Sequence, residues 1–300
     1  MSNSFREILD KVKNNNRKTI AVAAAQDEPV LEAIRDAKNL GLINAILVGH
    51  KDKIIKIAKS IDLDVNDLEI IHEPDNNKAA LKAVELVSTG KAQMVMKGLL
   101  DTATILRAVL NKEIGLRTGR LMSHVAVFEI PGYDRLIFIT DAALNMYPDL
   151  QAKIDILNNA VTVAKAVGVD IPKVAPICAV EVVNPDMPAT IDASILSKMN
   201  ERGQIKGCIV DGPLAVDNAL SKEAANHKNI VSKVAGKADI LLLPSIEAGN
   251  VMYKTLTYTT NSKSGGIIVG AAAPVVLTSR ADSPESKLNA IALAALVSEI

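Results

Sequence analysis

The stretch AQMVMKGLLDTATILRAVLNKE, residues 92–113, shows most directly how the chain is expected to fold. Its apolar run, which ends at Lys97-Gly98, predicts a buried strand, and Asp101-Thr102 open a segment with apolar residues at helical spacing. Strands and helices alternate in this way along most of the chain. This order predicts crossover connections between parallel strands, and therefore an α/β fold with mostly parallel sheets.

Short apolar runs outside this stretch predict the other strands. Strands are expected at 19–26, 44–50, 68–73, 92–98, 124–130, 135–142, 174–180, 206–212, 239–245 and 265–278, the last long enough for two. The segments between them with helix-like patterns include 29–41, 77–90, 102–113, 150–168 and 229–238, and an amphipathic run ends the chain. One pair differs, because only four residues with Pro131-Gly132 separate 124–130 from 135–142, which predicts an antiparallel hairpin.

No linker, repeat or low-complexity tract marks a domain boundary. The hairpin is therefore the best candidate for the point where the chain passes from one lobe to the other. A chain of 300 residues can form two compact lobes. We expect a change of lobe near residue 125 and a return through the long apolar run at 265–278. The predicted first lobe is 1–125 plus 270–300, and the second is 126–269 with the hairpin at 124–142.

The composition excludes several classes of protein. Apolar residues make up 49% of the chain but aromatic residues only 2%, so the core must consist of Ala, Val, Ile and Leu. The 34 basic and 34 acidic residues balance, which argues against a general polyanion-binding surface, and the scarcity of aromatic rings argues against nucleic-acid stacking. No apolar stretch reaches the ~20 residues of a membrane span.

The compartment is predicted from the N-terminus and the cysteines. The N-terminal residues MSNSFREILDKVKNNN show no apolar signal region. Cys178 and Cys208 lie in apolar runs without a CxxC pair, so they are expected to be buried thiols in a reducing compartment. We therefore expect a cytoplasmic protein. Motifs of zinc hydrolases, serine-triad hydrolases, P-loop NTPases and standard Rossmann dehydrogenases are absent from the sequence.

Polar residues follow the apolar run near the C-terminus in PVVLTSRADSPESKLN, residues 274–289. Ser283 and Pro284 are a good N-cap and first helical residue, with Glu285 in the first turn. Ser279-Arg280 would then lie between a strand end and a helix N-terminus, where backbone N–H groups and a guanidinium favour an anion. The alternative is a simple cap beside a surface arginine that pairs with Asp282 or Glu285.

Other predicted strand ends also carry polar side chains. Each of them is compatible with ordinary turn chemistry, but these five loops and the one at Ser279-Arg280 make six, which together indicate one functional edge of the sheet. The residues concerned are Lys97, Asp101, Thr102, Thr140, Asp141, Glu181, Asn184, Asp211, Asp217, Glu247, Asn250 and Lys254.

Four blocks in order along the chain resemble the phosphate acetyl/butyryltransferase family. They are MVMKGLLDTATILRAVLN, DGPLAVDNAL, PSIEAGNVMYK and VVLTSRADSPESKLNAIALA, and the blocks KGLLDT and EVVNPDMPATIDA are closer to the butyryl than to the acetyl members. The resemblance implies an isocitrate dehydrogenase-like fold, with an active-site cleft between two α/β/α lobes. It also implies the reversible, metal-free reaction of acyl-CoA and phosphate to acyl phosphate and CoA. Butyryl-CoA is the expected acyl donor.

The resemblance assigns roles to several residues. Ser279 is expected to contact the CoA sulfur and Arg280 to bind the phosphate group. The family's catalytic aspartate aligns with Ser286, so the base is expected to be Glu285 or Asp282, unless CoA arrives as a thiolate. Substrate contacts are expected from residues on several strand ends: Lys97, Thr102, Asp211, Asn250 and Lys254. CoA enters as a substrate, no cofactor is expected, and a homodimer or larger homo-oligomer is expected.

Three alternatives remain open from the sequence. The first is a phosphate acetyltransferase acting on short-chain acyl-CoA. The second is a metal- and NAD-dependent dehydrogenase of the same fold, in which Asp211, Asp217 and Glu181 would form the metal site. The third is a CoA-binding protein without catalytic activity.

Overall fold

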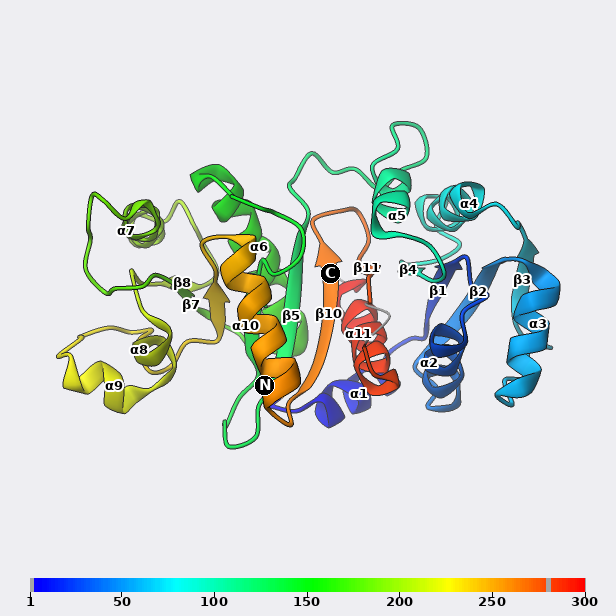
Figure 1. Ribbon diagram of the computed structural model, residues 1–300, viewed down its shortest axis with the longest axis horizontal. Coiled ribbons are helices and arrows are strands. Elements are labelled where there is room, and N and C mark those ends of the chain that lie inside the picture. Colours follow the sequence, from blue (N-terminus) through cyan, green and yellow to red (C-terminus); the bar gives the residue numbers. More distant parts are fainter. Residues whose placement is uncertain (1–2, 279–281, 300) are drawn as a thin grey trace. The chain divides into compact units, whose positions relative to one another are not determined.

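The structure of the protein is a computed structural model that describes residues 3–278 and 282–299. The described residues fall into two compact units. One consists of Phe5–Arg120 and Gly265–Ile300, and the other of Leu121–Ser264 with the first residues of the chain. Figure 1 shows the course of the chain through the elements of each unit.

The unit formed by the two ends of the chain is built on strands that run almost entirely in parallel. The strand order is β3-β2-β1-β4-β11-β10. Pairing is parallel from β3 to β11, and only β10 runs antiparallel to β11. The strands are β1 (Lys18–Ala23), β2 (Ile43–Gly49), β3 (Glu69–His72), β4 (Met94–Lys97), β10 (Lys263–Val269) and β11 (Val275–Val276).

Helices cover both faces of these strands. α4 (Asn76–Ser88) packs with α5 (Thr102–Val109) on one face, while α2 (Glu28–Asn39), α3 (Lys51–Ser60) and α11 (Pro284–Val297) form a layer on the other. α1 (Phe5–Lys13) packs on α11. Both faces of the strands are covered, and accordingly all four residues of β4 are buried.

Aspartate residues fix where the crossover helices begin. Asp27, Asp75 and Asp101 are the N-caps of α2, α4 and α5, and their carboxylates accept hydrogen bonds from the backbone N–H groups of the first turns at 3.3, 2.9 and 2.7 Å. Such caps satisfy N–H groups that have no partner within the helix. These three turns therefore hold the chain at the carboxyl ends of the strands.

The second unit contains the predicted hairpin. Its strand order is β5-β6-β9-β7-β8, and β5 pairs antiparallel with β6 while the other pairs are parallel. The strands are β5 (Ser123–Glu129), β6 (Ile137–Thr140), β7 (Lys173–Pro176), β8 (Ile209–Val210) and β9 (Ile240–Leu242). The helices are α6 (Leu150–Val167), α7 (Pro188–Glu201), α8 (Val216–Leu220), α9 (Lys222–His227) and α10 (Ile246–Thr259).

Most of the elements predicted from the sequence are confirmed. Every predicted strand segment contains a strand, the hairpin is antiparallel, and the run at 265–278 contains part of β10 and all of β11. Ser283 caps α11 and Pro284 is its first residue, as predicted. The predicted mixed α/β fold with mostly parallel strands is therefore found.

Two local predictions are wrong. Residues 229–238 form turns and not a helix. Gly236 has φ +70°, outside the α-helical region, and a Cβ there would lie 2.5 Å from the Cα of Lys222, the first residue of α9. The C-terminal helix α11 is not amphipathic along its length, because residues 289–296 are all buried.

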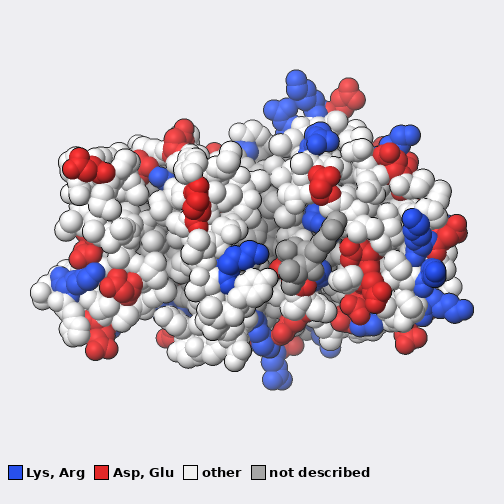
Figure 2. Space-filling view, in the orientation of Figure 1, with Lys and Arg blue, Asp and Glu red and all other residues white. Residues whose placement is uncertain are grey.

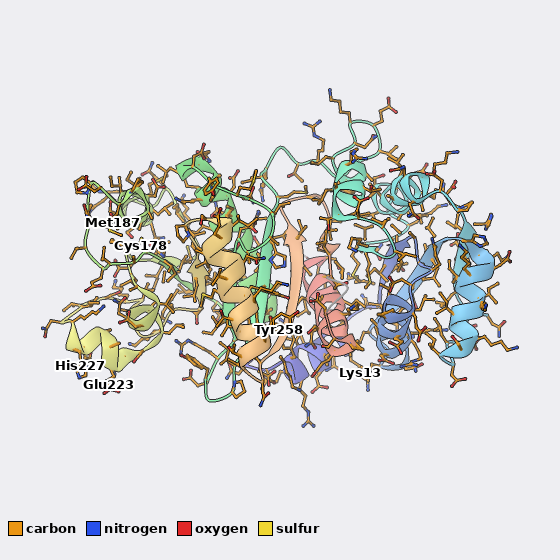
Figure 3. All side chains as sticks on the ribbon, in the orientation of Figure 1. Lys13, Cys178, Met187, Glu223, His227 and Tyr258 are labelled. Atoms are coloured by element: carbon orange, nitrogen blue, oxygen red, sulfur yellow. The ribbon has the colours of Figure 1, made fainter. Side chains whose placement is uncertain are left out.

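The two cysteines are buried free thiols, as predicted. Cys178 lies just beyond the end of β7 (Figure 3), and Cys208 just before β8. Burial raises the pKa of each thiol to about 11. Because the thiolate is the reactive form, neither thiol is suited to act as a nucleophile near neutral pH.

In the part of the chain that the structure describes, no helix is both long and apolar enough to span a membrane.

The junction of β4 and β1 leaves no room for a side chain at Gly98. The Gly98 N–H donates to the Ala23 carbonyl at 2.8 Å, and a Cβ on Gly98 would lie 2.3 Å from the Ala24 oxygen. We expect Gly98→Ala to lower the free energy of unfolding by about 1–3 kcal/mol, because backbone atoms must move apart. Urea unfolding measures this. Leu110→Ala, at a side chain that is 48% exposed, is the control and should have a smaller effect; equal stability of both variants would contradict the prediction.

Candidate active site

The carboxyl ends of the parallel strands meet at one edge of the unit that contains both chain ends. β1, β4 and β11 are neighbours there, with Ala23 paired with Lys97 and Met96 paired with Val276. The segments that leave these strands lead into α2, α5 and α11. Ligands of open α/β sheets bind at such edges, because strand ends and helix N-termini come together.

A pocket of about 210 Å³ lies at this edge. Its walls come from the start of α2, from the residues that follow β4, and from the two flanks of the segment between β11 and α11. The lining residues are Asp27, Pro29, Val30, Lys97, Gly98, Leu99, Thr278 and Lys287. The pocket therefore joins parts of the sequence that are up to 260 residues apart, from Asp27 to Lys287.

Lys97 is the last residue of β4 and its side chain is buried in the pocket wall. Its ammonium group donates hydrogen bonds to the carbonyl oxygens of Gly98 at 3.3 Å and Leu100 at 3.2 Å. A buried ammonium group is stable only with such polar partners. The loop after β4 thus holds a positive charge at the pocket.

Lys287 places a second ammonium group at the same pocket. Only 2% of the residue is exposed, although it lies in the first turns of α11. Its Nζ donates to the carbonyl oxygen of Asp282 at 2.5 Å. Burial lowers the pKa of Lys287, and the carboxylates of Asp282 and Asp27 oppose this shift. Two lysines and one aspartate give the pocket the charge that an anionic group such as phosphate requires.

Two of the residues predicted to be catalytic, Ser279 and Arg280, belong to the segment 279–281, which lies outside the described residues. Thr278, which immediately precedes them, is buried and lines the pocket. Asp282 follows them, and its backbone carbonyl is bound by Lys287.

The other predicted residues of this unit flank the pocket without lining it. Glu285 is exposed in the first turn of α11, where Ser286 donates its backbone N–H to the Ser283 hydroxyl at 3.1 Å. Thr102 is the exposed first residue of α5. Asp101 serves as the cap of that helix, and hydrogen bonds from the Thr104 backbone and hydroxyl lower the pKa of its carboxylate.

Three predicted residues belong to the other unit. Asp211 directly follows β8, whereas Asn250 and Lys254 lie on α10, which packs on β6. The strands β9 and β7 separate β6 from β8, so the structure does not group Asp211 with the other two. The Asn250 amide donates to the Ala142 carbonyl at 3.3 Å, and the Lys254 ammonium lies 5.8 Å from the ring centre of Tyr258, which Figure 3 labels on α10.

Two of the three carboxylates considered for a metal site, Glu181 and Asp217, pair with a lysine. Lys228 forms ion pairs with Glu181 at 3.2 Å and with Asp217 at 3.3 Å. A backbone hydrogen bond from Asn218, together with Lys228, lowers the pKa of Asp217. Within residues 3–278 and 282–299, no group of three or more His, Cys, Asp or Glu side chains is arranged to hold a metal ion.

Sequence reasoning missed Lys287 and Asp27 as pocket residues. The signal for Lys287 was its position near the start of a helix that is otherwise rich in Ala, Leu and Ile, KLNAIALAALV. A single lysine in such an apolar segment lies either in the protein interior or at the end of the helix. Because the segment was predicted to be amphipathic, the burial of Lys287 was not predicted. Asp27 was given no role from the sequence, and in the structure it is the N-cap of α2.

Comparison with known proteins identifies the family. Residues 4–80 and 72–295 match the family described as Phosphate acetyl/butaryl transferase. The chain belongs to this family. It is 69% identical to a phosphate butyryltransferase of Clostridium acetobutylicum over 99% of both chains. The predicted resemblance is therefore confirmed.

Solved structures confirm the predicted fold class. A branched-chain phosphotransacylase from Enterococcus faecalis V583 matches with a TM-score of 0.82 and 33% identity, over 94% of this chain and 99% of that one. A 4-hydroxythreonine-4-phosphate dehydrogenase from Klebsiella pneumoniae matches with a TM-score of 0.53 and 14% identity over 94% of this chain and 99% of that one. The second match concerns the fold alone, which this family shares with dehydrogenases, as predicted.

The buried charge of Lys287 predicts a measurable pH dependence of stability. Because burial lowers its pKa, the folded protein binds fewer protons than the unfolded chain between that lowered pKa and the usual lysine pKa of 10.5. We therefore expect the stability of the wild type to rise relative to Lys287→Met as pH increases through this window. The neutral amine still donates its hydrogen bond to Asp282.

Urea unfolding at several pH values between 7 and 10.5 gives this difference. Lys51→Met, at an exposed lysine of α3, is the matched control for general effects of alkaline pH. A constant difference between wild type and Lys287→Met across the range would show that the buried ammonium group does not titrate as expected.

Proposed function

We propose that the protein interconverts butyryl-CoA plus phosphate with butyryl phosphate plus CoA. It is a phosphate acyltransferase by family, as the sequence predicted. The observation that carries the butyryl preference is the full-length similarity to a phosphate butyryltransferase. The pocket with Lys97 and Lys287 supports the proposal, because it offers two ammonium groups to a phosphate at the strand edge.

The proposed reaction is a direct transfer in a ternary complex. An oxygen of phosphate attacks the thioester carbonyl carbon, the carbon–sulfur bond breaks, and CoA leaves as a thiolate that takes up a proton. Holding both substrates together provides much of the rate by positioning. The buried thiols of Cys178 and Cys208 are unsuited to form an acyl-enzyme, which agrees with direct transfer.

The assignment of roles remains our proposal. Arg280 binds phosphate with Lys97, and Ser279 contacts the CoA sulfur. Asp282 and Glu285 are the candidates for the base, since Ser286 takes the position of the family's aspartate. Contacts to the substrates are proposed for a further four residues: Thr102, Asp211, Asn250 and Lys254.

The alternatives differ in what they require. An acetyltransferase would prefer acetyl-CoA, although one buried methylene contributes only about 0.8 kcal/mol, so neighbouring acyl groups should overlap as substrates. For the dehydrogenase, the ion pairs of Glu181 and Asp217 with Lys228 disfavour the metal site considered from the sequence. A CoA-binding protein would bind CoA without turnover.

Further properties belong to the same proposal. We propose that the enzyme acts in the cytoplasm, that CoA and acyl-CoA are substrates, and that no metal or other cofactor takes part. We also propose a homodimer or larger homo-oligomer, and that the two units are the two lobes, with boundaries near residues 125 and 270.

The activity is tested by adding phosphate to butyryl-CoA and measuring the release of CoA, with acetyl-CoA in parallel and EDTA in both. We expect phosphate-dependent release, insensitive to EDTA and faster with butyryl-CoA. Arg280→Ala should lower kcat/KM by about 10²–10³, as expected for a donor that stabilises charge in the transition state. Arg6→Ala, at an exposed residue of α1, is the control and should be unaffected. No release from either thioester by folded protein would exclude the proposal.

The base is identified by pH–rate profiles of Asp282→Asn and Glu285→Gln. The variant that removes the base should lose about 10²–10⁴-fold in kcat together with the ionisation that the profile shows. Glu113→Gln, an exposed glutamate outside the pocket, is the control. If both variants keep kcat within a few-fold of the wild type, CoA reacts without a base from these two residues.

A further inference from the structure

A large groove lies beside the candidate active site, in the same unit. Its volume is about 1200 Å³. One wall is a face of α3, and the other is the loop after β3 with the first residues of α4, Pro74 to Asn77. None of the functional residues predicted from the sequence lines this groove.

Three lysines of α3, Lys53, Lys56 and Lys59, form one wall of the groove. Their spacing of three residues places them on one face of the helix. Lys53 and Lys59 are about 9 Å apart along the helix axis, at 1.5 Å per residue. This separation suits several phosphate groups of one ligand better than a single small anion.

The three ammonium groups have no hydrogen bond or ion pair to the part of the chain that the structure describes. Other lysines of the same unit do have partners: Lys38 pairs with Asp67 at 3.7 Å and Lys82 with Glu85 at 2.7 Å. Figure 2 shows basic side chains gathered over α3. In a chain whose formal net charge is zero, this wall is a local excess of positive charge.

The rest of the lining suits a nucleoside better than a simple anion. Ile57 is half-buried and Leu99 is 40% exposed, so both offer apolar surface to a ring. Glu28, Asp75 and Asn77 add acceptors and an amide on the other side of the groove. Ring amino groups and ribose hydroxyls are donors that such acceptors can bind.

The groove and the active-site pocket share part of their lining. Leu99 lines both. The segment that leads into α2 also contributes to both, with Gln26 and Glu28 in the groove and Asp27 and Pro29 in the pocket. A single extended ligand can therefore have its reacting end beside Lys97 and its other end beside α3.

We propose that the groove binds the phosphorylated adenosine end of CoA, with Lys53, Lys56 and Lys59 contacting its phosphates. The inference rests on the proposed function, because CoA has both a reacting thiol end and a polyanionic nucleoside end. The adenine ring lies against Ile57, and Leu99, which lines both cavities, lies along the path to the reacting end. A free adenine nucleotide shares this chemistry, and the experiment separates the two sources.

The test measures binding of adenosine 3′,5′-bisphosphate by calorimetry, with no turnover involved. The wild type is compared with the triple variant Lys53→Gln/Lys56→Gln/Lys59→Gln and with Lys51→Gln, a matched control on the same helix outside the groove. Each exposed ion contact contributes about 2–5-fold to the affinity. Three such contacts give about 8–125-fold, so we expect the triple variant to bind the bisphosphate more weakly by about this factor, and Lys51→Gln to bind like the wild type. Added salt should weaken binding by the wild type more than by the triple variant.

Competition and kinetics identify the source of the ligand. CoA should displace the bisphosphate from the wild type, and the triple variant should show a raised KM for butyryl-CoA with little change in kcat. With 3′-dephospho-CoA the difference between wild type and variant should shrink. Circular dichroism and the unfolding midpoint confirm that the triple variant is folded.

The outcomes separate this inference from the proposed function. Activity of the wild type combined with unchanged bisphosphate binding and KM in the triple variant would overturn the groove assignment and leave the acyltransferase in place. Bisphosphate binding that CoA does not displace would also overturn it, in favour of a site for a free nucleotide. Lysine-dependent, CoA-displaceable binding without turnover would support the groove and refute the acyltransferase.

Discussion

Parallel pairing of the central strands is the constraint on which the candidate site depends. The backbone groups of β1 and β4 are buried and must pair along their length. Parallel pairing with the neighbouring strands satisfies them, and it also makes the strands end at one edge. At the pocket, the Gly98 N–H donates a hydrogen bond to the Ala23 carbonyl and so joins the ends of β4 and β1. Residues as distant in sequence as Asp27 and Lys287 meet there for this reason.

The sequence predicted the strands well because they are buried on both faces. A strand covered on both sides needs a continuous apolar run, and β1, β2 and β4 show this pattern. The hairpin of β5 and β6 was visible because four residues with Pro131-Gly132 leave no space for a crossover. A helix was wrongly predicted at residues 229–238 because their apolar spacing fits one. In the structure, Gly236 has a positive φ and packs against the backbone of Lys222, which is not compatible with a helix.

The site was harder to predict, since distances between residues far apart in sequence are not encoded in local patterns. Lys97 could be found because it ends a strand. Lys287 could not, because its burial depends on how α11 packs against α2. The groove of Lys53, Lys56 and Lys59 was hidden because lysines on a helix usually form an ordinary solvated face. Their number is unremarkable, and only the groove beside them and the absence of partners within the described residues distinguish them.

The burial of both cysteines has a practical consequence for studying this protein. A thiol with a pKa of about 11 is almost entirely protonated at neutral pH, so it exchanges slowly with aromatic disulfide reagents. The free thiol of released CoA reacts with the same reagents readily. Turnover can therefore be followed continuously by colour formation, with a low background from the folded polypeptide. A sudden rise of that background would also report that the unit containing Cys178 and Cys208 had opened.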